Sequence, residues 1–317
     1  MLVSLNSLLH KALEKKFAVP AFNVNSMEMV QAVFSAAEKS KSPVIIGITP
    51  SALEYSSDLL PSIVFARARF SKIPFALHLD HGRNFSDCKK AVSLGFSSVM
   101  IDASINYEKK DFSGKHPARD FSENSAITKK VVEFARSKGI SVEGEIGTLG
   151  GIEDSASASA HLTSPEEAKQ FAEETGIDAL AIAIGTSHGA YKFKGNPSLK
   201  LEIVKQTRKL LPKMPLVLHG ASSVPKETVE QCRKFCLNIG AEAQGVPILQ
   251  IKKAISFGIC KINIDTDARL AFMGAMLQKV HDYNGAIDLR EYFGEGRSAI
   301  EKIFVQKMKD FGSTGKL

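Results

Sequence analysis

Short apolar runs alternate with longer amphipathic stretches along the whole chain. The runs are rich in Val, Ile, Ala and Leu, and the stretches between them repeat their apolar positions with the helical period. Because the runs are apolar at nearly every position, they indicate strands buried on both faces, as in a parallel sheet. We predict eight strands, at residues 18–24, 43–49, 74–80, 97–103, 141–147, 179–185, 215–219 and 260–265.

Eight βα units in succession predict an α/β fold, the (β/α)8 TIM barrel. The sequence contains no stretch with the composition of a linker, so residues 1–317 are predicted to form a single barrel domain. After residue 268 the pattern is only helical or irregular. We therefore expect extra C-terminal helices that pack on the barrel.

Several helix boundaries are marked by residues with known end preferences. Ser164, Pro165 and Glu167 supply a capping serine, a proline in the first turn and a capping-box glutamate. Gly176 marks the end of the same helix, because glycine readily adopts the left-handed conformation that terminates helices. Glycines precede three predicted strands in the same way: Gly95, Gly139 and Gly258.

The composition is that of a soluble globular protein. Of its 317 residues 44% are hydrophobic and 24% are charged, and no apolar run approaches the roughly 20 residues of a membrane span. We therefore expect no membrane association and a cytoplasmic location. The four cysteines show neither a CxxC pair nor the spacing of a zinc cage, and we interpret them as buried or idle thiols.

The net charge of +7 raises the question of a nucleic-acid partner. The lysines and arginines are scattered, however, and the chain has no Trp and only five Tyr for base stacking. We predict no nucleic-acid binding and attribute the excess positive charge to a small anionic substrate.

Three histidines share one setting. His81, His188 and His219 each stand near the end of an apolar run, and a glycine follows each of them. The carboxyl ends of barrel strands meet at one rim, and a catalytic zinc takes three protein ligands and keeps one position open. We predict one metal site from these three, although a lone histidine at a strand end is more often a hydrogen-bonded structural residue. His78 is interpreted as an orienting neighbour, and four histidines are expected at the surface: His10, His116, His161 and His281.

Carboxylates cluster at the same rim: Asp80, Asp102, Glu143, Glu145, Glu153, Asp265 and Asp267. Acids at the ends of apolar strands are costly to bury without a cation or proton chemistry. Asp80, next to a predicted ligand, is the candidate general acid/base. The alternative for Asp80 is a structural carboxylate that binds backbone N–H groups.

Four loops at this rim add to the expected site. Gly220-Ala-Ser222-Ser223 and Asn263-Ile-Asp265-Thr266-Asp267 follow the last two strands, where barrels bind phosphate through backbone N–H groups, although Gly-Ser loops also occur as plain turns. Residues 105–123 and 147–163 are long for barrel loops, the first charged and the second small and flexible. We predict lids, with a disordered surface excursion as the alternative.

These motifs together resemble the class II, metal-dependent fructose-1,6-bisphosphate aldolases. The matching segments run in order over almost the whole chain: His78-Leu-Asp-His-Gly82, Val99-Met-Ile-Asp-Ala-Ser104, Glu143-Gly-Glu-Ile-Gly147, Gly150-Gly-Ile-Glu-Asp154, Gly185-Thr-Ser-His-Gly-Ala-Tyr-Lys192, His219-Gly-Ala-Ser-Ser223 and Lys261-Ile-Asn-Ile-Asp-Thr-Asp267. Tagatose-bisphosphate aldolases of the same superfamily are similar in nearly every motif.

The resemblance implies a catalytic Zn²⁺. Its ligands would be His81, His188 and His219. Glu145 would lie near an alternative metal position, and Asp102 would support the ligands without being one of the three. The resemblance also implies a monovalent cation, Na⁺ or K⁺, close to the phosphate loops.

The resemblance further implies how the substrate is handled. Asp80 would take the proton from the C4 hydroxyl during cleavage, Glu153 would exchange the proton at C3, and Asn263 would hold the enediolate. The dihydroxyacetone phosphate moiety would be surrounded by Gly189, Gly220, Ser222, Asp265 and Thr266.

The second phosphate of a sugar bisphosphate would be bound by residues from two subunits. Arg290 matches an arginine that in the family comes from a neighbouring subunit, which implies a homodimer or homotetramer. Lys192 follows His188 in the same loop and is included among the substrate-binding candidates. Thr49 is included as well, although Thr49-Pro-Ser51 stands where relatives usually have Ser-x-Gly. The chain also departs from the family after Ser104, where roughly a dozen residues are inserted.

The predicted activity is the reversible cleavage of fructose 1,6-bisphosphate to dihydroxyacetone phosphate and glyceraldehyde 3-phosphate, a step of glycolysis and gluconeogenesis. The alternatives are the same chemistry on tagatose 1,6-bisphosphate and, from another class, a non-catalytic barrel that serves as a scaffold. The segment Asn263 to Asp267 is closer to the fructose group. A Schiff-base mechanism is disfavoured, because Lys261 is placed at the beginning of the eighth strand and no lysine is expected near a strand end.

Overall fold

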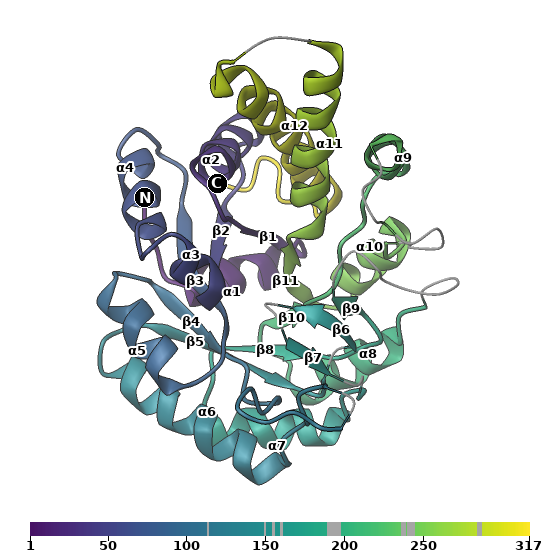
Figure 1. Cartoon of the computed structure of the whole chain (residues 1–317). Helices are drawn as coiled ribbons and strands as arrows, with labels where there is room; N and C mark the ends of the chain where they lie inside the picture. The colour runs from purple at the N-terminus through teal and green to yellow at the C-terminus, as the bar shows by residue number, and fades with distance from the viewer. Residues whose placement is uncertain are drawn as a thin grey trace.

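Eight parallel strands form a closed barrel in the order β1-β11-β10-β8-β5-β4-β3-β2 (Figure 1). The computed structural model describes residues 1–112, 114–148, 150–153, 156–158, 161–188, 198–235, 239, 245–283 and 287–317. The barrel strands are β1 (Val19–Asn23), β2 (Val44–Ile48), β3 (Phe75–Gly82), β4 (Ser98–Ile101), β5 (Ser141–Ile146), β8 (Ala179–Ile182), β10 (Leu216–Leu218) and β11 (Ile259–Ile264). Each strand overlaps one predicted run, so the predicted TIM barrel is confirmed.

Helices cover the outside of the barrel, and their ends follow local sequence signals. The helices that follow the first seven strands are α2 (Met27–Ser40), α3 (Pro50–Tyr55), α4 (Leu60–Ala68), α5 (Phe85–Ser93), α6 (Phe121–Arg136), α7 (Pro165–Thr175), α8 (Leu201–Leu210), α9 (Lys226–Lys234) and α10 (Ile248–Ser256). The Ser164 side chain accepts a hydrogen bond from Glu167 N at the start of α7, and Gly176 ends it with φ 69°. Both predicted boundaries are confirmed.

Two long helices complete the chain after β11, as predicted. α11 (Thr266–Asp282) leads away from the barrel, and α12 (Leu289–Asp310) returns to pack against α2 and β1. The rings of Phe22 and Phe304 stack with their centroids 3.9 Å apart, which fixes α12 on the outer face of β1. α12 therefore occupies the outer position that belongs to the eighth barrel helix.

A first helix, α1 (Leu5–Lys15), precedes the barrel. Leu5, Leu8 and Leu9 are buried in one apolar cluster with inward-facing strand residues such as Ala76 and Val217. Because the cluster fills the barrel interior beside α1 with apolar side chains, the polar interior residues are left to the other end.

A small three-stranded sheet adds to the barrel. β6 (Gly150–Glu153) pairs antiparallel with β7 (Ala156–Ala158) and parallel with β9 (Ser187–His188). Within the predicted flexible loop over 147–163, residues 150–153 and 156–158 therefore form paired strands, and the lid stays a prediction. Gly, Ala and Ser have little strand preference, so pairing between strands rather than local preference explains this conformation.

None of the helices in the described ranges combines the length and apolar content that crossing a bilayer requires.

Candidate active site

The carboxyl end of β3 has an irregular backbone. Its pairing with β4 shifts register between Leu79 and Gly82, and His81 adopts the left-handed conformation with φ 51°. This break in the strand alternation lets Asp80 and His81, which are consecutive, turn toward the same space. Gly82 is required beside them, because a Cβ there would lie 2.5 Å from the Met100 carbonyl oxygen.

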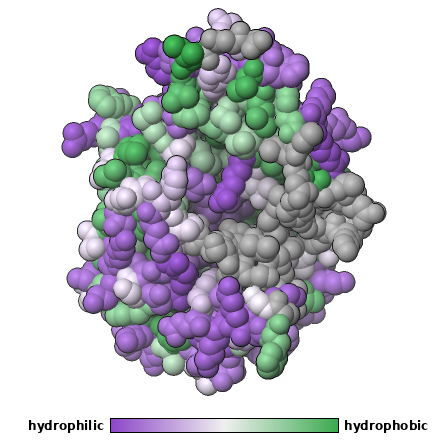
Figure 2. Space-filling model, viewed as in Figure 1, coloured by the Kyte–Doolittle hydropathy of each residue, from purple (hydrophilic) through white to green (hydrophobic). Residues whose placement is uncertain are grey.

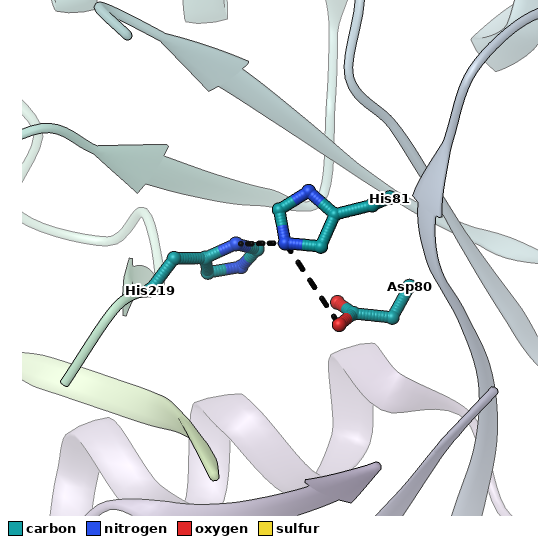
Figure 3. A group of neighbouring side chains, drawn as sticks. All are labelled: Asp80, His81 and His219. Atoms are coloured by element: carbon teal, nitrogen blue, oxygen red, sulfur yellow. Dashed lines mark hydrogen bonds and ion pairs between the residues drawn. The ribbon is translucent and has the colours of Figure 1, made fainter. Parts of the chain in front are cut away.

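His219 approaches this strand end from directly after β10. Its Nδ1 lies 3.1 Å from Nε2 of His81, and Oδ2 of Asp80 lies 3.9 Å from the same His81 nitrogen (Figure 3). All three side chains are buried. Two of the three predicted rim histidines, His81 and His219, thus lie close to each other and to the Asp80 carboxylate.

The carboxylates behind the two imidazoles select their tautomers. Nε2 of His219 donates to Oε1 of Glu143 at 2.9 Å, and Nδ1 of His81 faces Oδ2 of Asp102 at 3.5 Å. With protons on those outer nitrogens, the two inner nitrogens, 3.1 Å apart, direct lone pairs at one another. That arrangement is unfavourable unless a proton or a cation lies between them.

Glu145 provides a second indication of a cation. Its Oε2 is buried 3.7 Å from Nδ1 of His219 and has no hydrogen-bond partner among the described residues. Burial first, and then the charge of Asp102, raise the pKa of Glu145 well above its ordinary value. Imidazole nitrogens with carboxylate oxygens are the donor set of catalytic zinc sites, so these residues fit Zn²⁺. In the part of the chain that the structure describes, donor atoms converge within 4.8 Å in two groups: Asp80, His81 and His219, and His81, Asp102 and Glu145.

Asp80 is held as a carboxylate by side-chain amides. Nδ2 of Asn23 donates to its Oδ2 at 2.8 Å, and Nδ2 of Asn263 donates to its Oδ1 at 2.7 Å. Burial alone raises the pKa of Asp80, but the charges of His81 and Lys261 and the bond from Asn23 outweigh it and lower the pKa below its ordinary value. Asp80 is therefore kept in its ionised form, the form that a proton acceptor requires. Its hydrogen-bond partners among the described residues are side-chain amides, not the backbone N–H groups of the structural alternative.

A charged network lies beneath these groups inside the barrel. Nζ of Lys261 donates to both oxygens of Glu143 at 2.8 and 2.9 Å and to Nε2 of His78 at 3.2 Å, and it lies 4.0 Å from Oδ1 of Asp80. Lys261 is the third of the six residues of β11, in its first half as predicted, and it is fully buried. Since Glu143 binds its ammonium group, Lys261 is a poor Schiff-base nucleophile.

His78 reaches the site through this network. His78 is a neighbour of Lys261, which binds Glu143, which in turn binds His219. Its Nδ1 pairs with Ser98 Oγ at 2.9 Å. His78 thus supports the site indirectly.

The predicted phosphate loops lie at the ends of β10 and β11. Gly220 has φ 62° and Ser222 is buried, while Thr266 is the first residue of α11, where unpaired backbone N–H groups favour anions. Asp265 pairs with Arg269 at 2.8 Å. The negative charge of Asp265 is therefore balanced close to this helix end.

Asp267, Ser223 and Lys307 tie the phosphate loop to the last helix. Nζ of Lys307 lies 2.6 Å from Oδ1 of Asp267 and donates to the Ser223 carbonyl oxygen at 2.7 Å, and Ser223 N donates to Asp267 at 3.2 Å. Lys307 is almost completely buried. α12 therefore helps to fix the loop that follows β10.

Other predicted residues have different surroundings. Thr49 caps α3, and its Oγ1 accepts from Ala52 N at 3.3 Å. Arg290 is exposed in the first turn of α12 and pairs with Asp288 at 2.6 Å. His116 is buried, which corrects the predicted surface position, whereas His10, His161 and His281 are exposed as expected.

Of the predicted site residues, two lie outside the described residues and two are described by their backbones alone. Gly189 and Lys192 lie outside the described residues. Glu153 ends β6 and His188 lies in β9, beyond the end of β8 at Ile182, and only their backbones are described. Gly151 pairs with His188, so β6 runs beside the segment that carries this histidine.

Sequence reasoning missed several residues that touch the site. Asn23 and Lys261 are polar side chains within apolar runs, and that contrast is a signal that could have identified them. Tyr107 and Lys307 stand in polar surroundings that offered no such signal.

The chain is similar to known proteins over nearly its whole length. The family model described as "Fructose-bisphosphate aldolase class-II" matches residues 3–316. A fructose-bisphosphate aldolase of Giardia intestinalis is 45% identical over 318 residues, covering 99% of this chain and 94% of that protein. One of Thermus caldophilus is 44% identical over 319 residues, covering 100% of both.

Among solved structures, the YdjI aldolase from Escherichia coli K12 aligns with a TM-score of 0.78 at 33% identity and covers 100% of this chain and 99% of that one.

Proposed function

The chain belongs to the class II fructose-bisphosphate aldolase family, whose members are lyases. On this basis we propose how its active site works. The reaction is the reversible cleavage of fructose 1,6-bisphosphate to dihydroxyacetone phosphate and glyceraldehyde 3-phosphate with a bound Zn²⁺. One observation carries the proposal: the Asp80 carboxylate lies 3.9 Å from His81, whose Nε2 faces His219 across 3.1 Å.

His81, His188 and His219 would hold the zinc ion, with Glu145 at an alternative position and Asp102 behind His81. When bound, the ion supplies positive charge that polarises the substrate carbonyl and stabilises the negative charge that cleavage releases.

Asp80 takes the proton from the C4 hydroxyl in the cleavage direction and returns it in condensation. The bonds from Asn23 and Asn263 keep its carboxylate oriented, and the neighbouring charges keep it ionised. Asn263 would also hold the enediolate, for which its amide group has a second N–H donor. We assign the proton exchange at C3 to Glu153, supported by its place at the end of β6, beside the strand that carries His188.

The phosphate of the dihydroxyacetone half is assigned to the loops after β10 and β11. The amino end of α11 supports this assignment, and Gly189, Gly220, Ser222, Asp265 and Thr266 would line the site. Thr49 and Lys192 are proposed for the remaining substrate contacts. A Na⁺ or K⁺ ion near these loops is part of the proposal.

Arg290 is proposed to reach the second phosphate in a neighbouring subunit. α11 starts at the site and has 17 residues, so it leads about 25 Å away before the chain reaches Arg290 in α12. Apolar side chains are exposed where α11 ends and α12 begins: Val280, Tyr283, Ile287, Leu289 and Phe293. Figure 2 shows apolar surface gathered over α11 and α12. Such a surface supports a homodimer or a homotetramer built on it.

A cytoplasmic location is also proposed, since the buried thiols of Cys88, Cys232 and Cys260 would stay reduced there.

The test measures cleavage with purified protein. Fructose 1,6-bisphosphate should be cleaved, a chelator should abolish the activity, Zn²⁺ should restore it, and borohydride with substrate should leave it intact. Close to one Zn²⁺ should be bound per chain. Inactivation by borohydride together with resistance to chelator would instead identify a Schiff-base enzyme.

The epimer, tagatose 1,6-bisphosphate, is the control substrate. We expect a higher kcat/KM for the fructose compound with the same zinc-loaded protein. The reverse order would assign the chain to tagatose bisphosphate.

A further inference from the structure

The insertion after Ser104 folds back on itself beside the metal site. Ile105 forms a bridge with Ala118, and Asn106 N donates to the Pro117 carbonyl oxygen at 2.9 Å. Nδ1 of the buried His116 lies 2.8 Å from the Lys109 carbonyl oxygen, which ties the outgoing and returning halves together. The insertion therefore has a defined path over its described residues.

This path brings Tyr107 to the carboxylate behind His81. Oη of Tyr107 donates to Oδ2 of Asp102 at 2.6 Å, and Oγ of Ser104 donates to Oδ1 at 2.7 Å. The same Oδ2 lies 3.5 Å from Nδ1 of His81. Two hydroxyl groups thus fix the plane of Asp102, whose Oδ2 also faces the imidazole of His81.

A hydrogen bond from a hydroxyl group to a carboxylate oxygen is of the strong, charge-assisted kind. The two hydroxyl groups bind different oxygens of Asp102, so its carboxylate cannot rotate without losing one of these bonds.

We propose that Tyr107 is a positioning residue for the metal site: through Asp102 it sets the orientation of His81, and this is what the insertion contributes. The proposal rests on the proposed function, since it takes His81 as a zinc ligand. A carboxylate that binds the outer nitrogen of a metal-binding histidine fixes its tautomer and raises its basicity, and loss of such support typically weakens metal binding about 10- to 100-fold.

The first experiment compares zinc affinity. Wild type, Tyr107→Phe and Ser104→Ala are incubated as zinc-loaded proteins with increasing amounts of a chelator of known affinity, and the zinc retained is measured. Tyr107→Phe removes only the hydroxyl, so we expect zinc to bind about tenfold more weakly, and Ser104→Ala should shift in the same direction. Tyr55→Phe, at the exposed end of α3, is the matched control and should match wild type.

The second experiment asks whether Tyr107 acts through Asp102. In the Asp102→Ala background, Tyr107→Phe should cause no further loss of zinc affinity, whereas a merely structural effect would persist undiminished. Unchanged affinity in Tyr107→Phe, or an equal loss with and without Asp102, would overturn the proposal. If wild type itself held no zinc, the proposed function would fail first, so the two failures are distinguishable.

Discussion

Asp80 and His81 are consecutive residues, yet Oδ2 of one lies 3.9 Å from Nε2 of the other in the same buried space. A regular strand would point them to opposite faces. The left-handed backbone at His81, which costs about 1–2 kcal/mol for a residue other than glycine, removes that alternation. One strand end thereby fixes the distance between the proposed proton carrier and the proposed metal ligand.

Replacing Asp80 should separate metal binding from catalysis. Asp80→Ala is expected to keep its zinc, because the histidines remain, and to lose turnover by a factor of about 100 to 10,000, the usual contribution of a general base. Metal analysis and kcat for fructose 1,6-bisphosphate check this. Asp87→Ala, an acid on α5, serves as a control for loss of charge. A variant with nearly normal kcat would remove Asp80 from the acid/base role.

The buried pair of Lys307 and Asp267 should be important for stability. Lys307→Met leaves the Asp267 carboxylate buried without its cation, which typically costs about 3–5 kcal/mol in the free energy of unfolding. Denaturant unfolding measures this, and the double variant with Asp267→Asn should recover part of the loss. Lys309→Met, exposed on the same helix, should stay close to wild type. Equal stability of the two lysine variants would contradict the importance of the pair.

His78 should make the protein sensitive to mild acid. Burial, and then the charge of Lys261, lower its pKa well below the ordinary 6.5, so the folded state keeps the ring neutral where the unfolded chain protonates it. The stabilising contribution is complete above pH 6.5. It is lost below that pH at about 1.4 kcal/mol per unit, because the unfolded state binds more protons.

The His78→Gln variant should lose this pH dependence. Urea unfolding between about pH 5 and pH 7 compares its slope with those of wild type and of the exposed control His10→Gln. Identical slopes in all three proteins would show that His78 does not carry the effect.

Complementation between subunits can test the role of Arg290. Arg290→Ala and His81→Ala should each be almost inactive as homo-oligomers. After subunit exchange, a mixed dimer would combine an intact metal site with an intact arginine at one of its two sites, so part of the activity should return. Absence of recovery despite demonstrated exchange would argue against a shared site.

The sequence by itself determined the barrel and most of its polar rim. Apolar runs in a parallel sheet are a local pattern, and the histidines and acids that follow them needed no tertiary information to be found. The place of His81, Asp80 and His219 at one barrel end follows from strand direction alone.

Only the tertiary structure decided which of these polar groups touch. The left-handed backbone of His81, the pairing of Lys261 with Glu143, and the approach of Tyr107 to Asp102 all join residues through strand register or loop path. Sequence separation does not encode such distances. The reason is physical: buried charges must find partners wherever the fold places them, and Lys261 finds Glu143 118 positions away because β11 and β5 face one interior.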